Sequence, residues 1–162
     1  MQRLAVNNML IIRQYQPTDK GKVRELHIRA LEPTGAMLPG GPWNDDDLSD
    51  ITDQYLTNGG EFLVGVLDNR IVCMGALKKK SDTAGEIKRM RVLPDFQRKG
   101  YGQLILDSLD IKARKLGFTE LYLDTTTKQI PAQNFYKKNG YQEISRMVFA
   151  GLEIIFFEKQ LA

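Results

Sequence analysis

Apolar positions recur along the chain with two different periods, and these periods predict seven strands and four helices. Apolar residues that return every three or four positions indicate one buried helix face, whereas apolar residues that alternate or run together between turn residues indicate a strand. Helices are predicted at residues 19–31, 45–56, 103–116 and 132–139. Strands are predicted at residues 10–15, 61–67, 71–79, 86–92, 119–124, 141–149 and 152–159.

Turn residues place the boundaries of these elements. Pro94 ends the strand at residues 86–92, because its ring fixes φ and removes an N–H group. Gly117 follows the central helix as its C-terminal stop. Two hairpins are expected, one over Asp68-Asn69-Arg70 and one over Ala150-Gly151.

The stretch from Glu86 to Gly117 combines a strand, a turn with two glycines and a helix. The first N–H groups of a helix have no partner within it, and the helix dipole adds partial positive charge there. Gly100 and Gly102 carry no side chain, so a phosphate oxygen can approach the backbone closely. Arg98 and Lys99 add two positive charges. The stretch therefore predicts a site for a phosphate or pyrophosphate group.

The glycine turn does not match two common phosphate-binding patterns. The phosphate loop needs a Gly-Lys-Ser/Thr triplet, which is absent, and the dinucleotide fingerprint needs Gly or Ala where Ile105 stands. The turn Gln97-Arg98-Lys99-Gly100-Tyr101-Gly102 resembles instead the Gln/Arg-x-x-Gly-x-Gly/Ala turn of the GCN5-related N-acetyltransferases, the GNAT superfamily. The segment Ala132-Gln133-Asn134-Phe135-Tyr136-Lys137-Lys138-Asn139-Gly140-Tyr141 resembles a second motif of that family, Ala-x-x-Phe/Leu-Tyr-x-x-x-Gly-Phe/Tyr.

The resemblance covers nearly the whole chain and implies a fold and a cosubstrate. The fold is the GNAT fold, of class α/β (α+β), with a central mixed, mostly antiparallel twisted sheet of about seven strands flanked by about four helices. The cosubstrate is acetyl-CoA, with no metal. The glycine turn would bind its pyrophosphate, and the strand backbone before the turn would pair with its pantetheine arm. The resemblance places on acetyl-CoA the residues Met90, Arg91, Val92, Gln97, Arg98, Lys99, Gly100, Tyr101, Gly102, Gln129, Ala132, Asn134 and Tyr136.

Two residues are candidates for proton transfer. Tyr136 matches the family tyrosine near the coenzyme sulfur, which implies a general acid; a phenol with its ordinary pKa of ~10 is protonated at neutral pH. From spacing alone, a core tyrosine on an amphipathic helix is the simpler interpretation. Glu86 is the candidate general base for the amine, directly or through water, and an ion pair with Lys88 or Arg89 is the alternative.

The acceptor is expected to be the primary amine of a small molecule, which attacks the thioester directly in a ternary complex. Met37, Leu38 and Trp43, in a loop rich in Gly and Pro, would form an apolar wall for it, or would cover the core. The cluster Asp45-Asp46-Asp47 is explained by a helix start, since acidic residues are favoured there; attraction of a cationic amine substrate is the alternative. A peptide N-terminus or a lysine side chain is the alternative acceptor, and a non-catalytic sensor of CoA is the alternative function.

Composition narrows the class of protein further. The 162 residues fit a single domain, residues 1–162, and the net charge of +3 is low for a nucleic-acid-binding protein. Cys73 is the one cysteine, so no intrachain disulfide is possible, which favours a reducing, cytoplasmic location. Its side chain is expected in the core. No apolar run approaches the ~20 residues that span a bilayer. His27 is expected to pack on a helix face, and the apolar run Ile154-Ile155-Phe156-Phe157 suits a homodimer or a buried strand.

Overall fold

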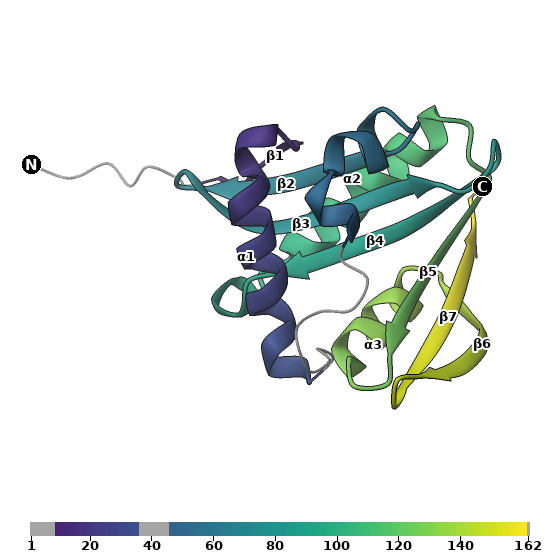
Figure 1. The fold of residues 1–162 in the computed structure, drawn as a ribbon. Helices are drawn as coiled ribbons and strands as arrows, with labels where there is room; N and C mark the ends of the chain where they lie inside the picture. Colours follow the sequence, from purple (N-terminus) through teal and green to yellow (C-terminus); the bar gives the residue numbers. More distant parts are fainter. Residues whose placement is uncertain (1–8, 36–45, 162) are drawn as a thin grey trace, which may run out of the picture.

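The computed structural model describes residues 9–35 and 46–161, and Figure 1 shows how the elements are arranged. Within these ranges, no helix is long and apolar enough to cross a membrane. The α-helices are α1 (Lys20–Leu31), α2 (Tyr101–Lys115) and α3 (Ile130–Lys138). The strands are β1 (Ile11–Gln14), β2 (Glu61–Leu67), β3 (Arg70–Lys79), β4 (Ala84–Val92), β5 (Glu120–Thr126), β6 (Gln142–Phe149) and β7 (Leu152–Gln160).

The strands form one mixed sheet in the order β1-β2-β3-β4-β5-β7-β6. Neighbouring strands are antiparallel except β4 and β5, which are parallel. This confirms the predicted mixed, mostly antiparallel sheet. β4 and β5 are paired over Ala84–Glu86 and Glu120–Tyr122, and beyond these residues the two strands diverge like the sides of a V (Figure 1).

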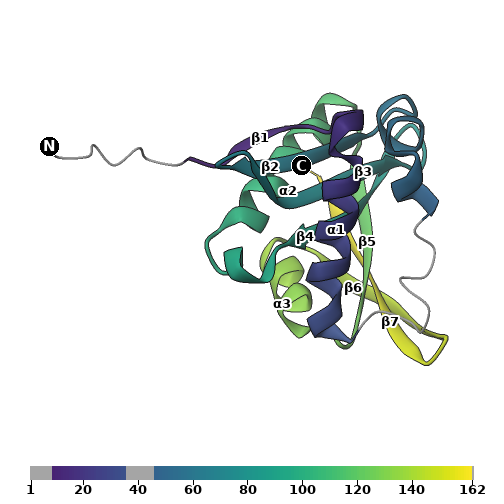
Figure 2. The ribbon, with the colours of Figure 1, turned by 60° about the vertical axis from the view of Figure 1, so that its left-hand side comes forward.

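Helices cover both faces of the sheet. α2 packs on β2, β3 and β4, and α1 packs on β3 and β4 from the opposite side (Figures 1 and 2). α3 follows β5 and lies beside the opening of the V (Figure 1). The apolar faces that the sequence predicted are buried here, with Leu26 of α1 and Leu109 of α2 as examples. Leu104 of α2, although apolar, is exposed.

A β-bulge interrupts the ladder between β3 and β4. Lys88 and Arg91 pair with the two residues of β3 that flank Gly75. Arg89 and Met90 therefore both lie opposite Gly75, so β4 holds one extra residue. Arg89 has a positive φ of 58°. The bulge bends β4 just beyond the residues that pair with β5.

The predicted α-helix at residues 45–56 is only partly correct. Residues 46–49 form a 3-10 turn, η3 (Asp46–Ser49), and residues 52–56 form a π-helical turn, η4 (Thr52–Leu56). The apolar residues that gave the helical spacing, Leu48, Ile51 and Tyr55, are buried as expected. Their burial does not require a regular α-helix, and Asp47 carries a contact with β4 that the spacing could not show.

The two predicted hairpins are confirmed. Asp68 and Asn69 both have positive φ between β2 and β3, as do Ala150 and Gly151 between β6 and β7. Two successive positive φ values match the right-handed twist of the flanking strands. β7 lies between β5 and β6 and buries most of its apolar residues, whereas β6 is exposed along its length.

Candidate active site

A cavity of about 580 Å³ lies where β4 and β5 diverge. The end of α1, the second half of β4, the turn before α2 and the start of α3 line it. Most of the residues that the resemblance placed on acetyl-CoA meet in this lining. They are Met90, Arg91, Val92, Gln97, Arg98, Gly100, Tyr101, Gly102, Gln129, Ala132 and Tyr136.

The turn before α2 exposes the N-terminus of that helix to the cavity. α2 begins at Tyr101, after Arg98 and Gly100 have both taken positive φ, 62° and 83°. The Gln97 side chain closes the turn by donating from Nε2 to the Val92 carbonyl oxygen at 3.1 Å. A Cβ placed on Gly100 would have no protein atom within 4 Å. The backbone is thus open to a ligand, and the first N–H groups of α2 are available to an anion.

The charge of the lining also fits a polyanion. Arg91, Arg98, Lys128 and Lys138 contribute to the wall, and among the described lining residues there is no carboxylate. The volume lies within the usual range of ligand pockets, about 300–1,000 Å³. A helix N-terminus, an open glycine and a basic rim together suit a ligand with a diphosphate group.

Three of the predicted residues lie outside this lining. Lys99 extends over the ring of Phe96, with Nζ 5.5 Å from the ring centroid. Asn134 is exposed on α3. Glu86 is at the closed end of the V, where β4 still pairs with β5. The candidate acceptor residues Met37, Leu38 and Trp43 fall outside the described residues.

Tyr136 is held on the buried face of α3. Its side chain is 7% exposed and packs edge-to-face on Tyr141, with ring centroids 5.7 Å apart. Burial raises the pKa of Tyr136 to about 12; the positive charge of Arg91 lowers it and the negative charge of Asp124 raises it. The phenol therefore stays protonated at neutral pH, and Tyr136 is one of the residues of α3 that line the cavity.

Two carboxylates lie on the strands that diverge. Glu86 forms ion pairs with Lys80, at 3.0 Å, and with Lys88, at 3.9 Å, which the sequence had named as the alternative to a base. Asp124 of β5 is exposed to solvent, yet desolvation by the surrounding protein and the charge of Glu86 raise its pKa, while Lys88 and Arg89 lower it. The sequence analysis missed Asp124, although strand alternation places it on the face opposite Leu123.

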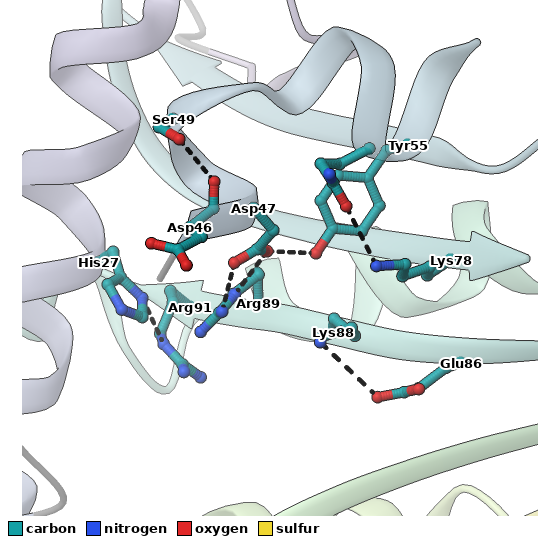
Figure 3. Close-up of polar contacts among 11 residues, drawn as sticks. His27, Asp46, Asp47, Ser49, Tyr55, Lys78, Glu86, Lys88, Arg89 and Arg91 are labelled. Carbon is teal, nitrogen blue, oxygen red and sulfur yellow. Dashed lines mark hydrogen bonds and ion pairs between the residues drawn. The ribbon is translucent and has the colours of Figure 1, made fainter. Parts of the chain in front are cut away.

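A network of buried polar groups joins α1, η3 and β4 (Figure 3). The Asp47 carboxylate accepts hydrogen bonds from the guanidinium of Arg89 and from the hydroxyl of Tyr55. The Arg91 Nε donates to Nδ1 of His27 at 3.4 Å. Burial, together with Arg91 and Arg89, lowers the pKa of His27 to about 3, so the imidazole is neutral at pH 7. His27 packs on the inner face of α1, as expected from the sequence.

The site thus points to a class: an α/β protein whose split sheet suits a phosphorylated ligand next to a buried phenol. The model of the "Acetyltransferase (GNAT) family" matches residues 22–141. The chain therefore belongs to the GNAT acetyltransferase family. Within residues 9–35 and 46–161, no group of three or more His, Cys, Asp or Glu side chains could hold a metal ion.

Curated relatives match this chain over part of their own length. N-acetyltransferase 8 of Homo sapiens is 30% identical over 134 residues, which are 74% of this chain and 59% of that protein. The uncharacterized N-acetyltransferase YvbK of Bacillus subtilis (strain 168) is 33% identical over 98 residues, 60% of this chain and 62% of that one. An amino-acid acetyltransferase of Azotobacter vinelandii is 27% identical over 152 residues, 92% of this chain and 32% of that one. The chain spans less than two thirds of each.

Solved structures share the fold. A GNAT acetyltransferase from Staphylococcus aureus Mu50 superimposes with a TM-score of 0.86 at 23% identity, covering 95% of this chain and all of that one. An acetyltransferase from Salmonella typhimurium, solved with its cofactor acetyl-CoA, gives a TM-score of 0.78 at 20% identity, covering 96% and 95% of the two chains. At these identities the likeness shows a common architecture.

Proposed function

We propose that the protein transfers an acetyl group from acetyl-CoA to a primary amine, by direct attack in a ternary complex. One observation carries this function: a cavity with four basic side chains and an open helix N-terminus leads to a buried, protonated tyrosine. Family membership supports it, because relatives that match the chain are named N-acetyltransferases.

Different groups of the chain would bind the two parts of acetyl-CoA, the charged pyrophosphate and the pantetheine arm. The N–H groups at the start of α2, with Arg98 beside them, would hold the pyrophosphate. The backbone of Met90 to Val92 would lie along the pantetheine arm, with Gln129 and Ala132 on the opposite wall. Bound there, acetyl-CoA supplies the acetyl group as a thioester. A backbone N–H of Met90 or Arg91 would stabilise the negative charge that develops on the thioester oxygen.

Proton transfer needs an acceptor for the amine proton and a donor for the departing sulfur. Tyr136 is the donor that lines the cavity. Both Glu86 and Asp124 are candidates for the acceptor, acting directly or through water. Asp124 is the better placed of the two, because the strands have already separated at its position, whereas Glu86 is bound by two lysines. A carboxylate with a raised pKa is also closer to the pKa that general base catalysis requires.

The acceptor that we propose is a small primary amine. The long match to a protein named amino-acid acetyltransferase supports a small substrate, and the two carboxylates would attract an ammonium group. Peptide N-termini and lysine side chains remain the alternative acceptors. A sensor that binds CoA without catalysis is disfavoured by the tyrosine in the cavity wall.

A thiol-release screen tests the proposal. Acetyl-CoA is mixed with the protein and with amino acids, polyamines, aminoglycosides or short peptides, and free thiol is measured against samples without acceptor. We expect saturable release with at least one small amine and acetylation of that amine by mass spectrometry. Binding of acetyl-CoA with no release on any acceptor would favour the sensor, and absence of binding would refute both.

We also propose a homodimer that forms through β6. This strand is the last in the described sheet, and Ile144, Met147, Val148 and Phe149 leave it with exposed apolar side chains. An uncovered edge with such residues favours pairing with a second copy. Light scattering should show a dimer for the wild type and a monomer for Val148→Asp, while Ile111→Asp, at another exposed apolar position, on α2, stays dimeric. A monomeric wild type at high concentration contradicts this.

A single domain and a cytoplasmic location stay predictions.

A further inference from the structure

The β-bulge of β4 requires a backbone conformation that its residue disfavours. Arg89 lies in the left-handed region, with φ of 58°. For a residue with a Cβ atom this region is sparsely populated, and the conformation persists only where surrounding contacts hold it. The ladder with β3 pairs Lys88 and Arg91 but neither Arg89 nor Met90. The side chain of Arg89 is therefore a candidate for the contact that holds the bulge.

The side chain of Arg89 is fixed by a buried carboxylate. Its Nε donates to Oδ2 of Asp47 at 3.0 Å and its Nη2 donates to Oδ1 at 2.6 Å. The two side chains are 11% and 9% exposed. The hydroxyl of Tyr55 donates to the same Oδ2, so Asp47 is itself fixed from η4 (Figure 3). A two-point bond of this kind sets the orientation of the guanidinium as well as its distance.

The bulge comes immediately before the wall of the cavity. Pairing of β4 with β5 ends at Glu86, and Met90, Arg91 and Val92 line the cavity beyond the bulge. The direction in which these residues run depends on the turn that the backbone makes at Arg89. A change of φ there would rotate the N–H groups of the wall away from a ligand.

We propose that the Asp47–Arg89 pair, supported by Tyr55, is a positioning device that holds the bulge and so shapes the wall that receives acetyl-CoA. Arg89 acts through the backbone of Met90 to Val92 and does not itself contact the coenzyme. The inference rests on the proposed binding of acetyl-CoA in this cavity.

Two substitutions of one residue separate this role from direct binding. Arg89→Ala removes the guanidinium and keeps the Cβ, so the positive φ loses its support. Arg89→Gly removes the same guanidinium, but glycine adopts positive φ readily. By calorimetry, we expect acetyl-CoA affinity to fall about tenfold in Arg89→Ala, about 1.4 kcal/mol, and to stay within about threefold of the wild type in Arg89→Gly.

Other outcomes decide against the device. Equal loss of affinity in both variants would indicate that the guanidinium contacts the coenzyme, and unchanged affinity in both would show that the bulge needs no support. Wild-type protein that fails to bind acetyl-CoA would refute the proposed function instead. Melting temperatures identify variants that are merely unstable, and Asp47→Asn, which keeps the shape of the side chain, replaces Arg89→Ala if the latter does not fold.

A matched control lies at the far edge of the sheet. Arg13 of β1 makes a two-point bond to Asp19, with distances of 2.7 and 3.0 Å. Arg13→Ala breaks another two-point Arg–Asp pair, made by Nη1 and Nη2, that does not adjoin the cavity, and we expect unchanged affinity for acetyl-CoA. The double variant Asp47→Asn/Arg89→Ala should bind no more weakly than Arg89→Ala alone, because both changes release the same bulge. Additive losses would show that the two residues act independently.

Discussion

Removal of a single oxygen atom, by Tyr136→Phe, tests the general acid most directly. The phenyl ring keeps the edge-to-face contact with Tyr141 and the contact with the neighbouring ring of Phe135. We therefore expect an unchanged fold and an unchanged affinity for acetyl-CoA. Turnover should fall, because the departing sulfur loses its proton donor.

The pKa of Tyr136 sets the size of the expected loss. A positioned acid contributes about 10²–10⁴-fold to a rate. Burial raises the pKa of Tyr136 to about 12, whereas a thiol such as that of cysteine titrates near ~8.5. Complete transfer of the proton to the sulfur is therefore uphill by roughly 3.5 pKa units, roughly 5 kcal/mol. The phenol acts mainly by hydrogen bonding to the developing thiolate, so we expect the low end of the range, about a hundredfold.

Tyr141→Phe is the matched control for this experiment. Tyr141 is also buried, its pKa is also raised by burial, and its ring touches that of Tyr136, but it does not line the cavity. Thiol release at saturating acetyl-CoA and amine should fall for Tyr136→Phe alone, with coenzyme affinity checked by calorimetry. If Tyr136→Phe turns over within about threefold of the wild type, or if both variants fall equally, the phenol of Tyr136 is not the acid.

Three further predictions follow from burial and charge. Glu86→Gln should move the acidic limb of the pH profile of kcat/KM to lower pH, because removing the charge of Glu86 lowers the raised pKa of Asp124. Asp124→Asn should abolish this limb, because it removes the base itself. A limb that stays in place in both variants would exclude Asp124 as the base. Cys73, whose pKa burial raises to about 12, should react with a thiol reagent in denaturant but not in the native protein. Gly60→Ala would place a Cβ atom 2.0 Å from a backbone oxygen of β3, so it should lower the free energy of unfolding, measured in urea, by about 1–3 kcal/mol. Gly21→Ala would place its Cβ in open space on α1, so it should raise the free energy of unfolding by up to about 1 kcal/mol.

Helices and turns that depend on a pattern of nearby residues were predicted from the sequence. The apolar face of α1 and the two hairpin turns depend on residues that are close together in the chain, so periodicity and turn residues suffice to place them. The segment after residue 45 shows where this fails. Leu48, Ile51 and Tyr55 have helical spacing, but a 3-10 turn followed by a π-helical turn buries them as well. Spacing shows which residues are buried and not which hydrogen bonds the backbone makes.

The cavity lining was predictable where a motif lies in one stretch and not where partners are distant. Two short segments were enough to place Tyr136 and the turn at residues 97–102 in one site, and these residues except Lys99 line the cavity. The bulge at Arg89 was not, because nothing in the residue type requires positive φ. Its partner Asp47 lies 42 positions earlier, and the sequence explained that aspartate by the start of a helix. Long-range pairs of charges leave no periodic signal in a single sequence.

Charge is divided between the basic cavity wall and the carboxylates Glu86 and Asp124, and under the proposed function this division would bring two differently charged substrates to one point. The cavity wall carries arginines and lysines, which attract phosphates and repel an ammonium group. The carboxylates Glu86 and Asp124 lie outside that wall and have the opposite preference. Tyr136 lies where the two fields meet, since the charge of Arg91 lowers its pKa and that of Asp124 raises it. An amine bound beside Asp124 would add positive charge and lower the pKa of the phenol further. The proton donor would then become a stronger acid only when the acceptor is in place.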